Sequence, residues 1–265
     1  MPSFPIIAIV GPTGIGKTRV GISVAKALNA EVVSVDSLQV YRHGGIITAK
    51  PTPEEMDGVP HHLIDYLDPD EEPVDVLTLA IAKIQQIHEA GKIPLIVGGS
   101  ISLTKPLLLQ PLIQQNQLSV IILHSKLCRL TPRLDARVDD MIDRGLFEEV
   151  RLLRALEEKA STTPGCDRGV WKAIGYNELR SVLECDKTDP KWTNGVNRMK
   201  ERTVRYAQEQ MKVIWSELIP AIQERKLSFA VFTVEDFTTF ENRVVQPAIL
   251  QAFEWIYGNS RTCFQ

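Results

Sequence analysis

Eight consecutive residues near the start of the chain, Gly11 to Thr18 (GPTGIGKT), have the types and spacing of a phosphate-binding loop. They follow the apolar run Ile6–Val10 and precede a helix-compatible stretch over 19–28. Glycines let backbone N–H groups turn inward, and the positive end of the following helix favours anions. Lys17 adds a point charge, and the Thr18 hydroxyl is a candidate ligand for Mg²⁺. The expected phosphate contacts are Gly11, Thr13, Gly14, Ile15, Gly16, Lys17 and Thr18.

A carboxylate follows the second apolar run of the chain rather than the third. Asp36 ends the stretch EVVSVD, whereas the third run ends IVGGS, up to Ser100, with no acid. P-loop NTPases use an acid after an apolar strand to help hold Mg²⁺. An acid in this other position favours a transferase, in which the carboxylate would face the acceptor, rather than a motor or switch ATPase. Small-molecule kinases also carry an acid near this point, so both classes stay open.

Short β-branched runs alternate with helical patterns, which is typical of βαβ units around a parallel sheet. Strands are expected at Ile6–Val10, Val32–Val35, Ile93–Val97, Val120–Leu123 and Phe229–Thr233. Helices are expected at 19–28, about 76–90, 102–109, 131–158 with a break near Gly145, 177–184 and 192–225. Thr131-Pro132 has the form of a helix start. We predict an α/β fold of the P-loop, nucleotide-kinase-like type. Its five parallel strands lie in the order second, third, first, fourth, fifth, flanked by helices.

The length of 265 residues fits one large α/β domain. We expect residues 1–128 and 229–233 to form the sheet core, and 129–225 to form a mainly helical part that closes the active-site channel. The formal charge of -3 gives no overall sign of nucleic-acid binding. The first strand begins within a few residues of Met1, and no apolar run approaches the ~20 residues of a membrane helix. We therefore expect a cytoplasmic monomer without membrane contact.

Seven collinear motifs carry a family resemblance. The motifs are GPTGIGKT (11–18), SVDSLQVY (34–41), TAKPTPEE (48–55), VPHHLID (59–65), IPLIVGGS (93–100), RVDDMIDRGLFEEV (137–150) and KAIGYNEL (172–179). In this combination the chain resembles the isopentenyltransferases that act on adenine N6, over roughly residues 6–215. That family includes tRNA dimethylallyltransferases and the shorter adenylate isopentenyltransferases, which make cytokinins.

Three departures from the tRNA-modifying branch favour the shorter one. Those enzymes insert a helical domain that grips the anticodon stem, whereas here about ten residues separate Leu109 from the next strand at Val120. No Cys/His zinc finger follows Trp215. Gln208 and Glu209 stand where the tRNA branch usually has basic residues. The resemblance therefore implies an adenylate dimethylallyltransferase, the first enzyme of cytokinin biosynthesis, and makes tRNA an unexpected partner.

The resemblance also implies roles for particular residues. The reaction transfers a dimethylallyl group from dimethylallyl diphosphate to N6 of AMP, ADP or ATP, with Mg²⁺ bound at Thr18. Asp36 is the expected base, and the catalytic set is Asp36, Lys17 and Thr18. The adenine-binding set is Asp36, Ser37, Gln39 and Ser100. Lys50, Lys172 and Arg205 are expected to contact phosphate, although Lys172 replaces the family's usual arginine and lacks its bidentate fork.

Three other functions remain open from the sequence. They are a tRNA dimethylallyltransferase acting on A37, a small-molecule P-loop kinase, and a nucleotide-binding module without activity. The preference among AMP, ADP and ATP is also open, as is the use of a hydroxylated donor.

Overall fold

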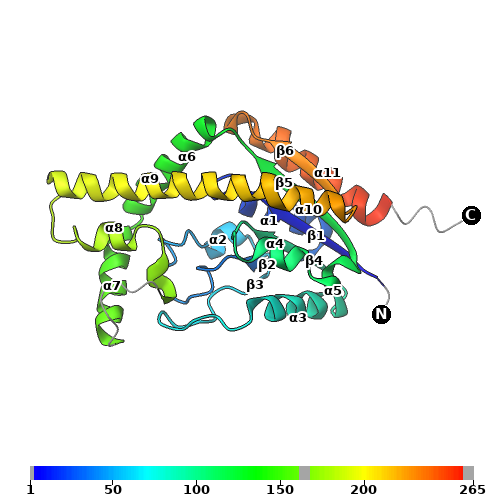
Figure 1. Cartoon of the computed structure of the whole chain (residues 1–265), viewed down its shortest axis with the longest axis horizontal. Coiled ribbons are helices and arrows are strands. Elements are labelled where there is room, and N and C mark those ends of the chain that lie inside the picture. The colour runs from blue at the N-terminus through cyan, green and yellow to red at the C-terminus, as the bar shows by residue number, and fades with distance from the viewer. Residues whose placement is uncertain (1–2, 161–167, 259–265) are drawn as a thin grey trace, which may run out of the picture.

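The computed structural model describes residues 3–160 and 168–258. It contains a six-stranded parallel sheet with helices on both faces (Figure 1). The strands are β1 (Pro5–Val10), β2 (Ala30–Val35), β3 (His61–His62), β4 (Ile93–Gly98), β5 (Gln117–His124) and β6 (Ser228–Thr233). The α-helices are α1 (Lys17–Leu28), α2 (Pro53–Met56), α3 (Val76–Glu89), α4 (Thr104–Leu108), α5 (Pro111–Gln114), α6 (Leu127–Asp143), α7 (Leu146–Lys159), α8 (Tyr176–Arg180), α9 (Pro190–Val213), α10 (Ile219–Glu224) and α11 (Gln246–Phe253). Short 3₁₀ or π segments are η1 (Gly169–Lys172), η2 (Ile214–Leu218), η3 (Phe237–Thr239), η4 (Glu241–Val245) and η5 (Glu254–Gly258).

The strand order is β3-β2-β4-β1-β5-β6. The five predicted strands are all present in the predicted order, and β1 lies between β4 and β5, with Ile9 beside both Val97 and Ile121. The predicted number of five strands is wrong, because β3 adds a sixth at the edge, beside Val32 and Val33. This strand consists of two histidines, and two polar residues give no apolar run by which a strand is recognised.

The side chains of β1 alternate between two hydrophobic cores, one on each face of the sheet. Ile7 and Ile9 pack in the core formed by α1, the start of α6, the middle of α9, and α11. Ile6, Ala8 and Val10 pack in the core formed by α3, α4, α5, η2 and α10. Burial on both faces explains the near-continuous apolar strands of the sequence.

A third core holds the mainly helical part together. It joins the end of α6 with α7, η1, α8 and the start of α9, and Trp171 and Tyr176 lie fully buried within it. The 24-residue helix α9 spans the molecule from this part to the sheet (Figure 1). Its residues contribute to two cores, Val196 and Met199 to the third, and Ala207 to the core beside α1. The same helix therefore fixes the helical part relative to the sheet.

Several helix boundaries differ from the predictions. The helix expected from residue 131 starts at Leu127 and contains Pro132, because Leu130 and Leu134 are buried against the sheet and stabilise the earlier turn. The predicted helix 102–109 is shortened to α4, and the short helix α5 that follows it was not predicted. The predicted helix 192–225 is interrupted by η2. The helical structure at 237–258 was not predicted. The Ser, Thr, Pro and Gly residues of 157–168 predict a loop, and most of it, like the last residues 259–265, lies outside the described residues.

None of the described helices combines the length and the apolar character that a membrane-spanning helix requires.

Candidate active site

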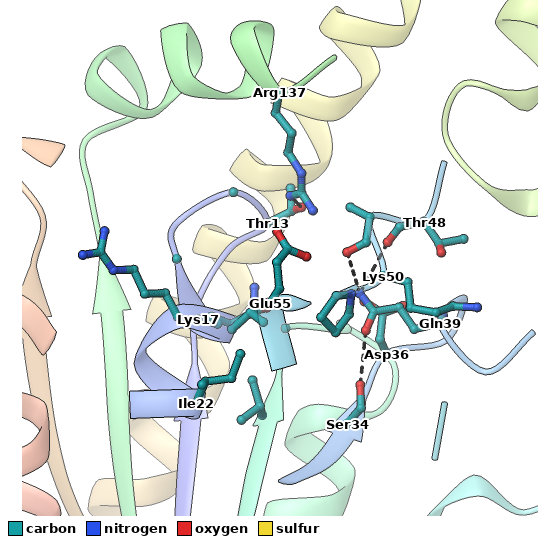
Figure 2. Close-up of a pocket in the computed structure, with 18 of the residues that line it drawn as sticks. Thr13, Lys17, Ile22, Ser34, Asp36, Gln39, Thr48, Lys50, Glu55 and Arg137 are labelled. Atoms are coloured by element: carbon teal, nitrogen blue, oxygen red, sulfur yellow. Dashed lines mark hydrogen bonds between the residues drawn. The ribbon is translucent and has the colours of Figure 1, made fainter. Parts of the chain in front are cut away.

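A cavity of about 770 Å³ opens where β1, β2 and β4 end. Ligands of parallel α/β sheets characteristically bind at this edge, outside the carboxyl ends of the strands. The cavity is lined by the loop after β1, by Asp36 after β2, by Gly98 and Gly99 at the end of β4, and by one side of α6 and of α9. Figure 2 shows the P-loop side chains and Asp36 facing one space.

The predicted phosphate-binding loop forms one wall of the cavity. Thr13, Gly14, Gly16, Lys17 and Thr18 line it, whereas Gly11 and Ile15 are buried behind the loop. Gly14 (φ 74°) and Gly16 (φ 103°) have left-handed backbones, which glycine adopts without a steric cost. Helix α1 begins at Lys17, so its positive end faces the cavity as the sequence predicts.

Burial lowers the pKa of Lys17 to about 8, and the Arg137 guanidinium acts in the same direction, whereas the Asp36 carboxylate raises the pKa. The Lys17 ammonium donates a hydrogen bond to the Pro12 carbonyl oxygen at 2.8 Å. Lys17 is therefore charged at neutral pH but loses its proton in mildly alkaline solution.

The affinity for the diphosphate donor that the family resemblance implies is expected to fall as the pH rises through about 8, because only the charged form of Lys17 attracts a diphosphate. Binding of a non-reactive dimethylallyl diphosphate analogue, measured by calorimetry between pH 6.5 and 9.5, tests this. The Lys17→Arg variant is the control, since its guanidinium stays charged over this range. An equal affinity of the wild-type chain at pH 7 and pH 9.5 would contradict the expectation.

Asp36 faces the cavity from the end of β2 (Figure 2). Its Oδ1 accepts backbone hydrogen bonds from Leu38 at 2.9 Å and from Gln39 at 3.3 Å. These bonds form a turn after β2, which is the structural role that an aspartate at such a position often has without any catalytic one. Both of these bonds use Oδ1, and neither of them occupies Oδ2.

Of the other residues predicted to bind adenine, only Gln39 lines the cavity. Its amide donates to the carbonyl oxygens of Thr48 and Ala49 at 3.4 and 3.2 Å, and its carbonyl accepts from Ser34 at 3.3 Å (Figure 2). Ser37 does not line the cavity. Ser100 is buried beside it, 3.3 Å from the Ser102 hydroxyl.

The three further residues predicted to contact phosphate lie in three different surroundings. Lys50 lines the cavity, but its ammonium is paired with Asp65 and donates to the Tyr41 carbonyl oxygen. Lys172 lies outside the cavity lining and forms an ion pair with Glu72 at 2.8 Å. Arg205 lines a second, open groove between α6 and α9 instead. A motif position shows where such a residue lies in the chain but not which partner its charge meets.

Two arginines of α6 reach the P-loop, and neither is among the site residues predicted from the sequence. Arg137 donates to the Thr13 hydroxyl at 3.1 Å, and Arg133 donates to the Gly14 carbonyl oxygen at 2.8 Å. Figure 2 shows Arg137 pointing from α6 toward Thr13. Burial lowers the pKa of Arg137, and the nearby Asp36 carboxylate raises it. Arg133 and Arg137 are four positions apart, which places both on one helix face. This spacing is the signal in the sequence that could have indicated them.

Tyr206 and Gln210, one turn apart on α9, line the cavity opposite α6. Gln210 accepts a hydrogen bond from the Thr13 N–H at 2.8 Å and donates to the Gly99 carbonyl oxygen at 2.5 Å, so it links the P-loop to the loop after β4. Burial, together with Asp36 and Glu209, raises the pKa of Tyr206 to about 12. Tyr206 is therefore a neutral hydrogen-bond donor beside Asp36.

The cavity residues fit a magnesium ion that is bound together with a diphosphate. Mg²⁺ usually takes one or two protein oxygens, several waters and the substrate phosphates. Thr18 supplies a hydroxyl at the start of α1. In residues 3–160 and 168–258, no cluster of three or more His, Cys, Asp or Glu side chains is arranged as a metal site. A protein-only metal cage is thus absent from the described chain, and Mg²⁺ would share its ligands with the donor.

Comparison with known proteins gives a family match. The model of the family described as IPP transferase matches residues 39–117 and 102–216. A bifunctional cytokinin biosynthesis protein of Fusarium pseudograminearum is 40% identical over 264 residues, covering 98% of this chain and 54% of the relative. A tRNA dimethylallyltransferase of Saccharomyces cerevisiae is 27% identical over 327 residues, covering 95% of this chain and 76% of the relative. The chain spans about half the length of the first curated relatives it matches, 54% and 48%.

A solved structure of a eukaryotic dimethylallyltransferase acting on tRNA superimposes with a TM-score of 0.84. It is 28% identical in sequence, and the match covers 97% of this chain and 80% of that one. Relatives named tRNA dimethylallyltransferase recur among the matches. The comparisons therefore lend no support to the expectation that tRNA is excluded as a partner.

Proposed function

The chain belongs to the IPP transferase family, and on that premise we propose that it transfers a dimethylallyl group from dimethylallyl diphosphate to N6 of free AMP, ADP or ATP. One observation carries this proposal. A single cavity contains a P-loop with Lys17 and Thr18 on one wall and the Asp36 carboxylate on another. The P-loop with Lys17 and Thr18 suits an anionic leaving group, and Asp36 suits an amine that must lose a proton.

The leaving group is stabilised at the P-loop. The exocyclic amine of adenine is a poor nucleophile, so the donor carbon–oxygen bond is largely broken in the transition state and charge builds on the diphosphate. Lys17, the N-terminus of α1 and Arg137 surround the place where this charge develops. Preorganised donors of this kind lower the barrier because they need no reorientation during the reaction. Mg²⁺, when bound, supplies further neutralisation of the diphosphate oxygens.

Asp36 accepts the proton that N6 loses as the new carbon–nitrogen bond forms. The turn at Leu38 and Gln39 fixes the carboxylate through Oδ1 and leaves Oδ2 toward the acceptor. Tyr206 remains protonated because its pKa lies near 12, and it can donate a hydrogen bond in the same space. The product would be an N6-prenylated nucleotide, and pyrophosphate would leave from the P-loop.

The connection between β4 and β5 supports a free nucleotide as the acceptor. It holds only the short helices α4 and α5, at the place where the resemblance leads us to expect the tRNA-gripping insertion. The two segments of the family match meet at residues 102–117, within this connection. The alignment with the yeast tRNA enzyme extends over 327 residues, 62 more than the 265 of this chain. The yeast enzyme therefore has at least 62 residues that match nothing in this chain. The alignment with the Fusarium relative extends over 264 residues, so it requires no such additional residues in the aligned part of that relative.

A tRNA acceptor is the second candidate, and the TM-score of 0.84 to a tRNA-acting enzyme favours it. Side-by-side turnover with AMP, ADP, ATP and an unmodified tRNA bearing A37 separates the two. We expect at least one free nucleotide to be prenylated with higher kcat/KM than tRNA. Any tRNA binding that remains should weaken steeply with salt, since phosphate contacts dominate nucleic-acid affinity. A higher efficiency with tRNA than with every free nucleotide would overturn the proposal in favour of the second candidate.

A further inference from the structure

We propose that three residues behind the P-loop, Phe237, Phe240 and Glu241, position the loop and two cavity arginines for the donor diphosphate. We name this set the C-terminal clamp. It follows β6 and lies beyond residue 216, where the family match ends. The inference rests on the proposed function, because it takes the P-loop as the site of the donor diphosphate.

Phe240 closes the back of the P-loop. Its side chain is 4% exposed and belongs to the core shared by α1 and α11. A Cβ atom built on Gly16 would lie 2.5 Å from Cζ of this ring, so the ring sits directly against the loop backbone. Interiors packed this closely resist displacement. The ring therefore limits how far Gly16, and the N–H groups beside it, can move away from a bound phosphate.

The clamp also holds two arginines at the rim of the cavity. The Arg133 guanidinium lies 4.7 Å from the centre of the Phe237 ring, while its Nε donates to the Gly14 carbonyl oxygen. Arg19 forms an ion pair with Glu241 at 2.6 Å and lies 5.8 Å from the centre of the Phe240 ring. Both arginines line the cavity. Each is thus oriented by an aromatic face or a carboxylate of the same short segment.

These two guanidinium groups repel each other in the absence of a ligand. Burial lowers the pKa of Arg133, and the like charge of Arg19 lowers it further. The Phe237 face and the Glu241 carboxylate offset this repulsion. A diphosphate in the P-loop would relieve the repulsion from the cavity side. The clamp therefore keeps two cations beside the loop before the donor arrives, and its loss should weaken the donor site specifically.

Calorimetry with the non-reactive analogue dimethylallyl S-thiolodiphosphate and Mg²⁺ tests the clamp. Phe237→Leu keeps an apolar side chain but removes the ring face, and we expect an affinity about 3- to 10-fold weaker, in the range of a cation–π contact. Phe237→Tyr restores the ring and should bind within about twofold of the wild-type chain. Phe240→Leu withdraws the ring from Gly16 and should also weaken binding. Leu250→Ala, which truncates a 63% exposed apolar residue of the following helix α11, is the control and should change nothing.

Steady-state kinetics distinguish positioning from a loss of stability. In Phe237→Leu the KM for the donor should rise, while the KM for the acceptor and kcat stay within about twofold, because only the diphosphate site is loosened. Thermal unfolding of each variant is recorded alongside. Equal donor affinity in the wild-type chain, Phe237→Leu and Phe240→Leu would overturn the clamp. It would also be overturned if Phe237→Tyr lost as much donor affinity as Phe237→Leu, or if Phe237→Leu raised the KM for donor and acceptor equally. If the wild-type chain does not bind the analogue, the proposed donor site fails and the clamp with it.

Discussion

Replacing Asp36 with asparagine is expected to lower turnover by at least ~10²-fold, the low end for lost general-base catalysis. Asparagine keeps an Oδ1 acceptor for the N–H groups of Leu38 and Gln39, so the turn after β2 should survive. It removes the basic oxygen that faces the cavity. The affinities for donor and nucleotide should therefore stay close to those of the wild-type chain, and the loss should appear in kcat.

Single-turnover kinetics with saturating donor and acceptor measure this loss without interference from binding. Ser37→Ala is a neighbouring control, because Ser37 does not line the cavity. If Asp36→Asn turns over within a few-fold of the wild-type chain, the aspartate serves the turn only and the assigned base is wrong.

Lys17→Ala should reduce both the affinity for the dimethylallyl donor and the turnover. The loss in kcat/KM is expected to reach ~10²–10³-fold, the range found when a hydrogen bond to developing negative charge is removed. Lys17 is partly buried at the cavity wall, and Lys50, which also lines the cavity, is paired with Asp65. Thr18→Ala should instead raise the Mg²⁺ concentration needed for half-maximal rate, because its hydroxyl is the predicted metal ligand.

Donor calorimetry and a magnesium titration of the rate separate these two effects. Lys83→Ala on α3 is the matched control, since this exposed lysine pairs with Gln86 away from the cavity. Unchanged donor affinity in both Lys17→Ala and Thr18→Ala would mean that the loop binds the acceptor's phosphates, which is the arrangement of a kinase.

The sequence predicts most of the sheet and one wall of the site, because both depend on local patterns. The apolar runs give five of the six strands, and right-handed crossovers give their order. The P-loop is recognisable because glycine spacing and the Lys17-Thr18 pair occur together over eight residues. The strand β3 is missed because its pairing with β2 is a backbone contact that two histidines do not reveal.

The other wall of the site depends on contacts between residues far apart in the sequence. Arg137 meets Thr13 across 124 positions, and Gln210 meets the same residue across 197. No local pattern encodes such a pairing. The same limitation applies to Lys172, whose predicted phosphate contact rests on its motif position alone, whereas in the structure its charge meets Glu72. The clamp residues Phe237 and Phe240 lie in a segment for which the sequence suggested no structure at all.

The most direct test of the account is the identity of the product formed from dimethylallyl diphosphate, Mg²⁺ and AMP. Mass spectrometry and release of pyrophosphate should be measured in the same reaction, with Asp36→Asn as the inactive control. The account predicts AMP that carries one dimethylallyl group on N6, with one pyrophosphate released for each transfer. The central claim would be contradicted if none of AMP, ADP and ATP became prenylated, even if tRNA did, or if the chain instead transferred the terminal phosphate of ATP to a small molecule.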